Sequence, residues 1–382
     1  MMIYLDNAAT TRTAPEAGEL MVHLQKSHIG NASALHVPGI EAATYIERAR
    51  IIIAGKINAD PDGIVFTSGG TESNNFALKG TAFANAEKRN HIIISAIEHP
   101  SVLACAQWLG TRGFKIDCIP VDSRGFVNPE DIEKTIRKET ILVSVMHANN
   151  EIGTIEPIAE IGAVCRRNGI YFHVDACQSF TRAELDVVKQ NIDLLSISGH
   201  KIHGPRGIGA VYIRKGVKVS PLLHGGGQEN GLRSGTYNTE AVAGFAKAVE
   251  ISKPDAVRRM SALRDYFIGE IQGRINDVIL NGPSEKRICN NISLTFKKAD
   301  AQSIFRKLNK KGIFISTGAA CTSGKTSSSH VLAALGNKDA EIYGAIRVSL
   351  SKWTTKKEID ITIETLSEIV SNERQRTADA GI

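Results

Sequence analysis

The sequence lacks an apolar run long enough to span a membrane, and it lacks closely spaced cysteines. A transmembrane helix needs about 18 or more consecutive apolar residues, so we expect none here. The segment from Met1 to Asp6 has neither the basic nor the apolar stretch of an export signal. No two of the six cysteines have the CxxC spacing of redox or zinc sites. We therefore expect a cytoplasmic protein with reduced thiols, no bound metal and no membrane association.

The chain also lacks a strong charge of either sign. It has 46 Lys and Arg residues against 40 Asp and Glu residues, and no basic run gathers the net charge of +6 into one patch. Such a bias permits an acidic partner but does not require one. With 382 residues, of which 42% are hydrophobic and 23% charged, the composition is that of a globular protein with two or three domains.

Between residues 60 and 215, short apolar runs alternate with longer amphipathic stretches. The apolar runs have the length and the β-branched content of strands. The predicted strands are 64–67, 92–95, 114–119, 141–146, 171–175, 194–198 and 209–213. The predicted helices between them are 71–83, 100–111, 128–137 and 157–167. This alternation predicts an α/β domain with a mainly parallel, doubly wound sheet that is covered on both faces.

The alternation ends at a glycine-rich segment, residues 222–238, which we expect to form a long functional loop. Helices at 240–252 and 255–274 should lead into a smaller α+β domain with strands near 291–296 and 346–351. The final helix is predicted at 356–371. Residues 372–382 lack an apolar face, so we expect them to be loose.

In sheets of this class, ligands bind beyond the carboxyl ends of the strands. The first predicted strand is followed by Ser68, Gly69, Gly70 and Thr71, with a helix starting at about Thr71. Backbone N–H groups at the start of a helix suit a phosphate group, and the Thr71 hydroxyl adds a donor. An ordinary capped helix could have the same pattern, because the segment is neither a Walker loop nor a GxGxxG fingerprint.

Two further strand ends carry polar side chains. His99 follows the second predicted strand, where an imidazole can stack on a planar ligand or move protons near neutral pH. Asn149 and Asn150 follow the fourth strand and can either bind a ligand or close a turn. Taken alone, each of these residues can also be explained by a structural role.

A carboxylate and an amine complete the pattern. Asp175 ends the fifth predicted strand, with Gln178 shortly after it, and an unpaired charge there would be costly, so a cation should lie against Asp175. Lys201 follows the sixth strand, after Ser198 and His200, where burial would lower the pKa of its amine and make it a nucleophile. A ligand with a phosphate, a cationic ring nitrogen and an aldehyde satisfies all of these groups. The combination predicts pyridoxal 5'-phosphate, bound as a Schiff base to Lys201 with its ring nitrogen paired to Asp175.

Several segments resemble the cysteine desulfurases, pyridoxal-phosphate enzymes of the class V aminotransferase family with the aspartate aminotransferase type of fold (fold type I). They are YLDNAATT at 4–11, GGTES at 69–73, VDACQS at 174–179, SGHKIHGP at 198–205 and IRVSL at 346–350. The segment STGAACTS at 316–323 resembles the loop that carries the sulfur-accepting cysteine of that family. The resemblance covers nearly the whole chain. It implies an N-terminal segment (1–15) that joins the small domain, a large cofactor-binding domain (16–255) and a small domain with the cysteine loop (256–382).

The resemblance also implies a role for each candidate residue. Lys201 would carry the cofactor, Cys321 would accept sulfur, and His99 would stack on the ring and serve in acid/base steps. The residues implied to bind the cofactor are Gly70, Thr71, His99, Asn150, Asp175, Gln178, Ser198, His200 and Lys201, together with Thr236 from the second subunit of a homodimer. The residues implied to bind the substrate are Arg347, Asn150, Asn31 and His36. Arg347 has its own physical reason, because the planar guanidinium fits a carboxylate bidentately.

The implied reaction converts L-cysteine to L-alanine and leaves a persulfide on Cys321. The stretch from Cys321 to Val331 is long, as in the branch of the family that hands sulfur to iron–sulfur scaffolds or tRNA-thiolation enzymes. The implied partner is therefore a sulfur-acceptor protein of that kind. Residues 324–330 lack the Glu-Pro of many relatives, and the tail after Ser371 lacks the aromatic, proline-containing ending that relatives use against a scaffold, so the acceptor stays open.

Two alternatives use the same residues. Selenocysteine lysis, transamination or another β-elimination would also need Asp175, Lys201 and Arg347. A non-catalytic binding or scaffold protein on the same fold is the third possibility, against which the intact Lys201, Asp175 and Cys321 argue. The other five cysteines are expected to be buried, inert thiols.

Overall fold

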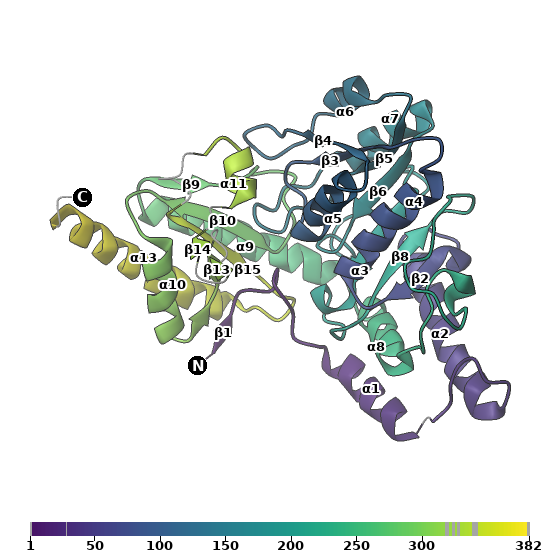
Figure 1. Cartoon of the computed structure of the whole chain (residues 1–382). Helices are drawn as coiled ribbons and strands as arrows, with labels where there is room; N and C mark the ends of the chain where they lie inside the picture. Colours follow the sequence, from purple (N-terminus) through teal and green to yellow (C-terminus); the bar gives the residue numbers. More distant parts are fainter. Residues whose placement is uncertain are drawn as a thin grey trace.

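The computed structural model describes residues 2–27, 29–317, 321–322, 325–326, 329–337 and 343–379, with the backbone alone at 321–322, 325–326 and 376–379. Most elements gather around two sheets, each with its own hydrophobic core (Figure 1). In these described ranges, no helix combines the length and the apolar composition that crossing a membrane requires.

The larger sheet has seven strands in the order β2-β8-β7-β6-β5-β3-β4. Its strands are β2 (Ile64–Thr67), β3 (His91–Ser95), β4 (Lys115–Ile119), β5 (Thr140–Ser144), β6 (Tyr171–Asp175), β7 (Leu194–Ser198) and β8 (Gly209–Ile213). Strand β8 is antiparallel to both of its neighbours, and the other neighbours are parallel. The predicted mainly parallel sheet is thus confirmed.

The expected strict alternation of strand and helix fails between β7 and β8. The link, residues 199–208, contains only a 3-10 turn at Gly199–Lys201. A parallel neighbour needs a crossover of a dozen or more residues, whereas a short link returns the chain in the opposite direction. The same short link places Lys201 directly after β7.

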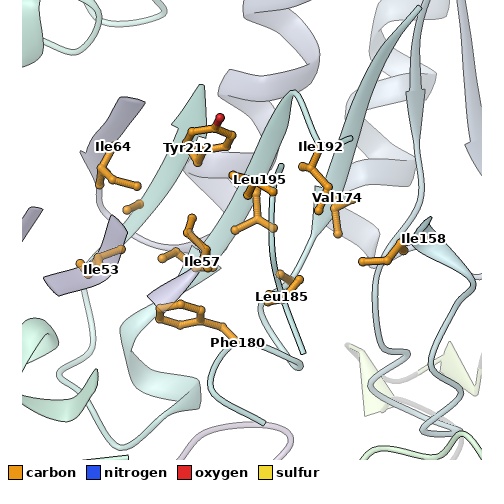
Figure 2. Close-up of a cluster of buried hydrophobic side chains, with 14 of the residues drawn as sticks. Ile53, Ile57, Ile64, Ile158, Val174, Phe180, Leu185, Ile192, Leu195 and Tyr212 are labelled. Carbon is orange, nitrogen blue, oxygen red and sulfur yellow. The ribbon is translucent and has the colours of Figure 1, made fainter. Parts of the chain in front are cut away.

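Helices cover both faces of the larger sheet. They are α2 (Val37–Lys56), α3 (Gly70–Asn75), α4 (Thr81–Asn85), α5 (Pro100–Gly110), α6 (Pro129–Thr135), α7 (Ile158–Asn168) and α8 (Thr239–Glu250), with a π-helical turn at Phe76–Gly80 between α3 and α4. Successive residues of a strand point to opposite faces. Ile93 therefore joins the core beneath α2, α7 and α8, while Ile92 and Ile94 join the core beneath α5. Figure 2 shows part of the first core, with Ile53 and Ile57 gathered near Leu195.

The smaller sheet is antiparallel, in the order β12-β15-β10-β9. Its strands are β9 (Val278–Leu280), β10 (Asn291–Phe296), β12 (Ser316–Thr317) and β15 (Ala345–Ser349). The helices of this part are α9 (Pro254–Arg274), α10 (Ala301–Lys310), α11 (His330–Ala334) and α13 (Lys356–Asp379). A short hairpin joins β13 (Cys321–Thr322) to β14 (Lys325–Thr326).

The N-terminal segment belongs with the smaller sheet. Strand β1 (Ile3–Tyr4) pairs in parallel with β11 (Ile313–Phe314), and Ile3 and Leu5 share the core of that part. Figure 1 shows β1 among these C-terminal elements, while α1 (Pro15–Ser27) lies with the larger sheet. The boundaries near residues 15 and 255 remain a proposal, which the two separate cores support.

Helix α13 is longer than predicted. It continues to Asp379, so the expectation that residues 372–379 would be loose was wrong; residues 380–382 lie outside the described part. Glu373 is buried and forms an ion pair with Lys307 of α10. Arg374 donates hydrogen bonds to three backbone carbonyl groups between residues 276 and 297. The ion pair of Glu373 and the hydrogen bonds of Arg374 thus hold this part of the helix in place, although it has no apolar face.

The glycine-rich segment 222–238 forms a loop, as predicted, with one 3-10 turn at Glu229–Gly231. The carboxylate of Glu229 is buried and accepts two hydrogen bonds of 3.0 Å from the guanidinium of Arg50 in α2. It also accepts one of 2.8 Å from the backbone N–H of Phe66 in β2. A buried ion pair therefore fixes the loop to the larger sheet.

Candidate active site

A cavity of about 210 Å³ lies at the carboxyl ends of the central strands of the larger sheet. It brings together all the predicted cofactor-binding residues except Thr236: Gly70, Thr71, His99, Asn150, Asp175, Gln178, Ser198, His200 and Lys201. Asn74, Ser101, Met146 and Cys177 complete its lining and were not predicted. A larger hollow of about 550 Å³ elsewhere in the described structure contains none of the predicted residues.

One end of the cavity has the features of a phosphate site. Gly69, two residues after the end of β2, has a φ of 149°, a conformation that a residue with a side chain rarely adopts. A Cβ on Gly70 would lie 2.6 Å from the Sγ of Cys177, so only glycine fits there. Thr71 lies in the first turn of α3, and the Oγ of Ser198 is buried without a hydrogen-bond partner among the described residues. The Ser198 hydroxyl is thus free for a group that is not part of the chain.

His200 and Arg206 lie at the same end. Burial, and then the positive charges of Lys201 and Arg206, lower the pKa of His200 to about 4, so its imidazole is neutral at pH 7. A neutral imidazole can donate a hydrogen bond to a phosphate oxygen. Arg206, which the sequence interpretation did not single out, lines a cleft of about 360 Å³ together with Thr71, Ser198 and His200. It supplies a positive charge close to this end.

Asp175 has no positively charged partner in the described part of the chain. Its side chain is buried, and its two oxygens accept hydrogen bonds from the amide of Asn74 at 2.7 Å and from the backbone N–H of Cys177 at 2.9 Å. No salt bridge with Lys, Arg or His is formed there. A buried carboxylate without a counter-charge is costly. The expected cation is therefore supplied from outside the chain, and a protonated ring nitrogen fits.

Lys201 presents its amine at the cavity. Its Nζ donates to the carbonyl oxygens of Ala8 at 2.6 Å and Ala9 at 2.8 Å. Burial is the main cause that lowers the pKa of this amine to about 8; the positive charges of Arg347 and Arg182 also lower it, whereas Cys177 and Asp175 raise it. A larger fraction of the amine is neutral, and hence nucleophilic, than in an exposed lysine.

His99 is the N-cap residue of α5 and lines the cavity. Its Nδ1 accepts a hydrogen bond from the backbone N–H of Ser101 at 3.1 Å and lies 2.8 Å from the Ser101 hydroxyl. Burial lowers the pKa of His99. The ring is thus held in place by the start of the helix that follows it.

Arg347 lies beside the cavity rather than in its lining. Its guanidinium pairs with the carboxylate of Asp6 at 2.8 Å and donates to the backbone carbonyl of Asn150 at 3.2 Å. Its Nε is buried and has no hydrogen-bond partner in the part of the chain that the structure describes. A substrate carboxylate would therefore share Arg347 with Asp6 or displace it.

The remaining predicted residues are not brought to the cavity by this chain. Asn31, His36 and Thr236 are exposed, and His36 caps α2 through a hydrogen bond of 3.2 Å from the backbone N–H of Gly39 to its Nδ1. The backbone of Cys321 lies in the β13–β14 hairpin. Its side chain lies outside the described residues.

The other cysteines are not all buried, contrary to expectation. Cys105, Cys165 and Cys289 are buried, and burial raises the pKa of each thiol. Cys118 is exposed because it faces outward from β4, the edge strand of the sheet. Cys177 lines the cavity, where burial and Asp175 raise the pKa of its thiol well above the usual value. A thiol held in its protonated form is a poor nucleophile.

Known proteins share this sequence and fold over nearly their full length. Residues 3–362 match the model of the family described as aminotransferase class-V. Cysteine desulfurase IscS of Dictyoglomus turgidum is 47% identical over 375 residues, which cover 97% of this chain and 95% of the relative. Cysteine desulfurase IscS of Clostridium botulinum is 44% identical over 378 residues, which cover 98% and 95%. A solved structure of a NifS-like protein superposes with a TM-score of 0.91 at 38% identity, covering 97% of this chain and all of the other.

The cavity and the comparisons agree. The cavity offers the Ser198 hydroxyl, the Asp175 carboxylate and the Lys201 amine of lowered pKa; among the described residues, the hydroxyl has no hydrogen-bond partner and the carboxylate forms no ion pair. These three groups fit pyridoxal phosphate, the cofactor that this class of enzymes uses. The chain therefore belongs to the aminotransferase class-V family, as one of its pyridoxal-phosphate-dependent cysteine desulfurases.

Proposed function

We propose that Lys201 holds the cofactor and Cys321 receives the sulfur when the enzyme converts L-cysteine to L-alanine. The first assignment rests on the presence of two groups in one cavity. One is the Lys201 amine with its lowered pKa, and the other is Asp175, a buried carboxylate that forms no ion pair with the described chain. The second assignment rests on the resemblance of residues 316–323 to the family's cysteine loop.

Pyridoxal phosphate supplies an aldehyde that captures an amino group and a cationic ring that withdraws electrons from the substrate. Asp175 favours the protonated form of the ring nitrogen. Thr71, Ser198 and His200 would hold the phosphate, and Gln178 and Asn150 would hydrogen-bond the polar ring substituents. The presence of each residue in the cavity lining supports these assignments.

The chain's own groups then handle the substrate. Arg347 binds the substrate carboxylate, with its unpartnered Nε as one donor. Lys201 would remove the proton from the substrate α-carbon, because a neutral amine of lowered pKa is a base near neutral pH. The ion pair between Asp6 and Arg347 weakens substrate binding, because the substrate carboxylate competes with the Asp6 carboxylate for the same guanidinium.

The sulfur step conserves atoms and electrons. The Cys321 thiolate attacks the sulfur of the bound cysteine, an S–S bond forms and the carbon–sulfur bond breaks with its electron pair going to carbon. A proton replaces the sulfur on that carbon, so alanine leaves and Cys321 carries the persulfide. A thiolate is required because it, and not the thiol, is the nucleophile.

We also propose a homodimer in which Thr236 reaches the cofactor of the partner subunit. Thr236 is exposed and is not among the residues that line the cavity of its own subunit, although it lies in a loop that a buried ion pair fixes in place. Leu35, Val37 and Ile40, at the start of α2, are exposed apolar side chains of the kind that an interface covers. Light scattering after size-exclusion chromatography tests this, and a monomeric holoenzyme would contradict it.

The proposed recipient of the sulfur is an acceptor protein of iron–sulfur assembly or of tRNA thiolation, in the cytoplasm. The support is the length of the cysteine loop in the sequence and the similarity to relatives named IscS. Transfer of radioactive sulfur from the loaded enzyme to purified candidate acceptors would identify it.

The test of the catalytic assignment compares two cysteine variants. Cys321→Ser should retain the visible absorbance of the bound cofactor and lose alanine release from cysteine. Cys118→Ser, the matched control, removes an exposed thiol remote from the cavity and should keep both. Normal turnover by Cys321→Ser would show that another group receives the sulfur.

A further inference from the structure

We propose that Asn74 and Ser101 are positioning residues that hold His99 as a neutral imidazole with its proton on Nε2. His99 then serves the cavity as a hydrogen-bond donor and not as a base. The proposal rests on the proposed function and assigns roles to two residues that the sequence interpretation did not single out.

A continuous set of hydrogen bonds joins Asp175 to His99. The Nδ2 of Asn74 lies 2.7 Å from the Oδ2 of Asp175 and 2.8 Å from the Oγ of Ser101. The Oγ of Ser101 lies 2.8 Å from the Nδ1 of His99, and the backbone N–H of Ser101 donates to the same Nδ1 at 3.1 Å. All four residues line the cavity.

The direction of each hydrogen bond follows from what each atom can do. An ionised carboxylate only accepts, so the amide nitrogen of Asn74 must face Asp175. The second N–H of that nitrogen then points to the Ser101 oxygen, which accepts it. The Ser101 hydroxyl proton is left for the Nδ1 of His99.

Two donors, the hydroxyl and the backbone N–H of Ser101, thus face one nitrogen of His99. A ring nitrogen that accepts hydrogen bonds carries no proton, so the proton of the neutral ring is on Nε2. A second proton on Nδ1 would face the hydrogen atoms of both donors, and both hydrogen bonds to Nδ1 would be lost. This agrees with the lowered pKa of His99, whose first cause is burial.

The charged groups around His99 come from four elements. Asp175 and Glu151 favour the charged ring, whereas Lys201 and His330 disfavour it. His330, at the start of α11, pairs its own Nε2 with the carbonyl oxygen of Glu98 at 3.0 Å. These charges oppose one another, while burial and the two donors at Nδ1 both favour the neutral ring.

The hydrogen bonds at Nδ1 give Lys201 and His99 different roles. An Nε2 that already carries a proton has no free lone pair to remove one from the substrate. Proton removal therefore falls to Lys201, and the contribution of His99 is a hydrogen bond from Nε2 to the bound substrate or cofactor. The Oδ1 of Asn74 is also buried, and no group of the described residues forms a hydrogen bond with it.

The test is nitrogen-15 NMR of the holoenzyme with labelled histidine, with the His99 signals assigned by loss in His99→Gln. We expect a proton-bearing nitrogen at Nε2 and a proton-free one at Nδ1 between pH 6 and 9. A proton on Nδ1 in the neutral ring would overturn the proposal. This readout does not depend on turnover, so a chain that fails to release alanine but shows the Nε2 proton would refute only the proposed function.

Variants test the positioning role. Ser101→Ala removes one of the two donors, so the pKa of His99 should rise and kcat should fall roughly 3- to 10-fold, the effect of one neutral hydrogen bond. Ser101→Thr keeps the hydroxyl and should restore both values. Asn74→Ala should raise the same pKa, while Thr111→Ala, a hydroxyl deletion at the far end of α5, should leave it unchanged. An unchanged pKa of His99 in both Ser101→Ala and Asn74→Ala would refute the positioning role.

Discussion

The lowered pKa of Lys201 predicts how fast the cofactor-free enzyme takes up pyridoxal phosphate at different pH values. Only the neutral amine attacks an aldehyde. With a pKa of about 8, about 9% of the amine is neutral at pH 7. At the ordinary value of 10.5 the neutral fraction would be about 0.03%, so burial makes the amine about 300-fold more available at this pH.

The assay is the initial rate of covalent attachment, followed by visible absorbance after mixing apoenzyme with pyridoxal phosphate from pH 6.5 to 10. The rate should rise about tenfold per pH unit below the pKa and level off above about pH 8. Lys201→Ala should show no attachment. Arg347→Gln removes one of the positive charges that lower the pKa, so its plateau should begin at higher pH. A wild-type rate that still rises tenfold per unit between pH 9 and 10 would refute the burial argument.

Two further predictions concern ion pairs. Glu229→Gln leaves the buried charge of Arg50 without its buried partner and with only the exposed Glu47, which should lower the free energy of unfolding by about 3 kcal/mol in denaturant titrations. Its control is Glu47→Gln, which removes an exposed partner of the same arginine and should cost under about 1 kcal/mol; equal losses would contradict the argument. Asp6→Asn removes the carboxylate that competes for Arg347, so KM for cysteine should fall roughly fivefold with little change in kcat. A raised KM in steady-state kinetics would show that Asp6 aids binding instead.

The sequence predicted the regular parts of the fold well where local patterns are strong. All seven predicted strands of the larger sheet are present, and six of them are buried along nearly their whole length, whereas the edge strand β4 is largely exposed. The reversed direction of β8 was not expected, since direction depends on the link before it. The extension of α13 was missed because the ion pair of Glu373 with Lys307 joins residues far apart in sequence.

In the candidate site too, some residues could be predicted from local sequence patterns and others could not. Asp175, Ser198 and Lys201 were found because each directly follows a strand, and the carboxyl ends of parallel strands meet at one edge. Asn74 and Ser101 lie inside helical turns, where a polar residue has no sequence signal that separates a hydrogen-bonding role from an ordinary surface position. Arg206 was missed for a similar reason, because it lies in a glycine-rich link.

The sequence by itself determined the class of fold, the kind of cofactor and the two groups proposed for the chemistry, because these depend on residue types at the ends of strands and on segments shared with a family. Only the tertiary structure decided that Asp175 has no cation among the described side chains, that Asp6 holds Arg347, and that Ser101 aims two donors at His99. The first two depend on distances between residues remote in sequence, and the third depends on the direction of two donors within the first turn of α5. Packing sets such distances, and no local pattern records them.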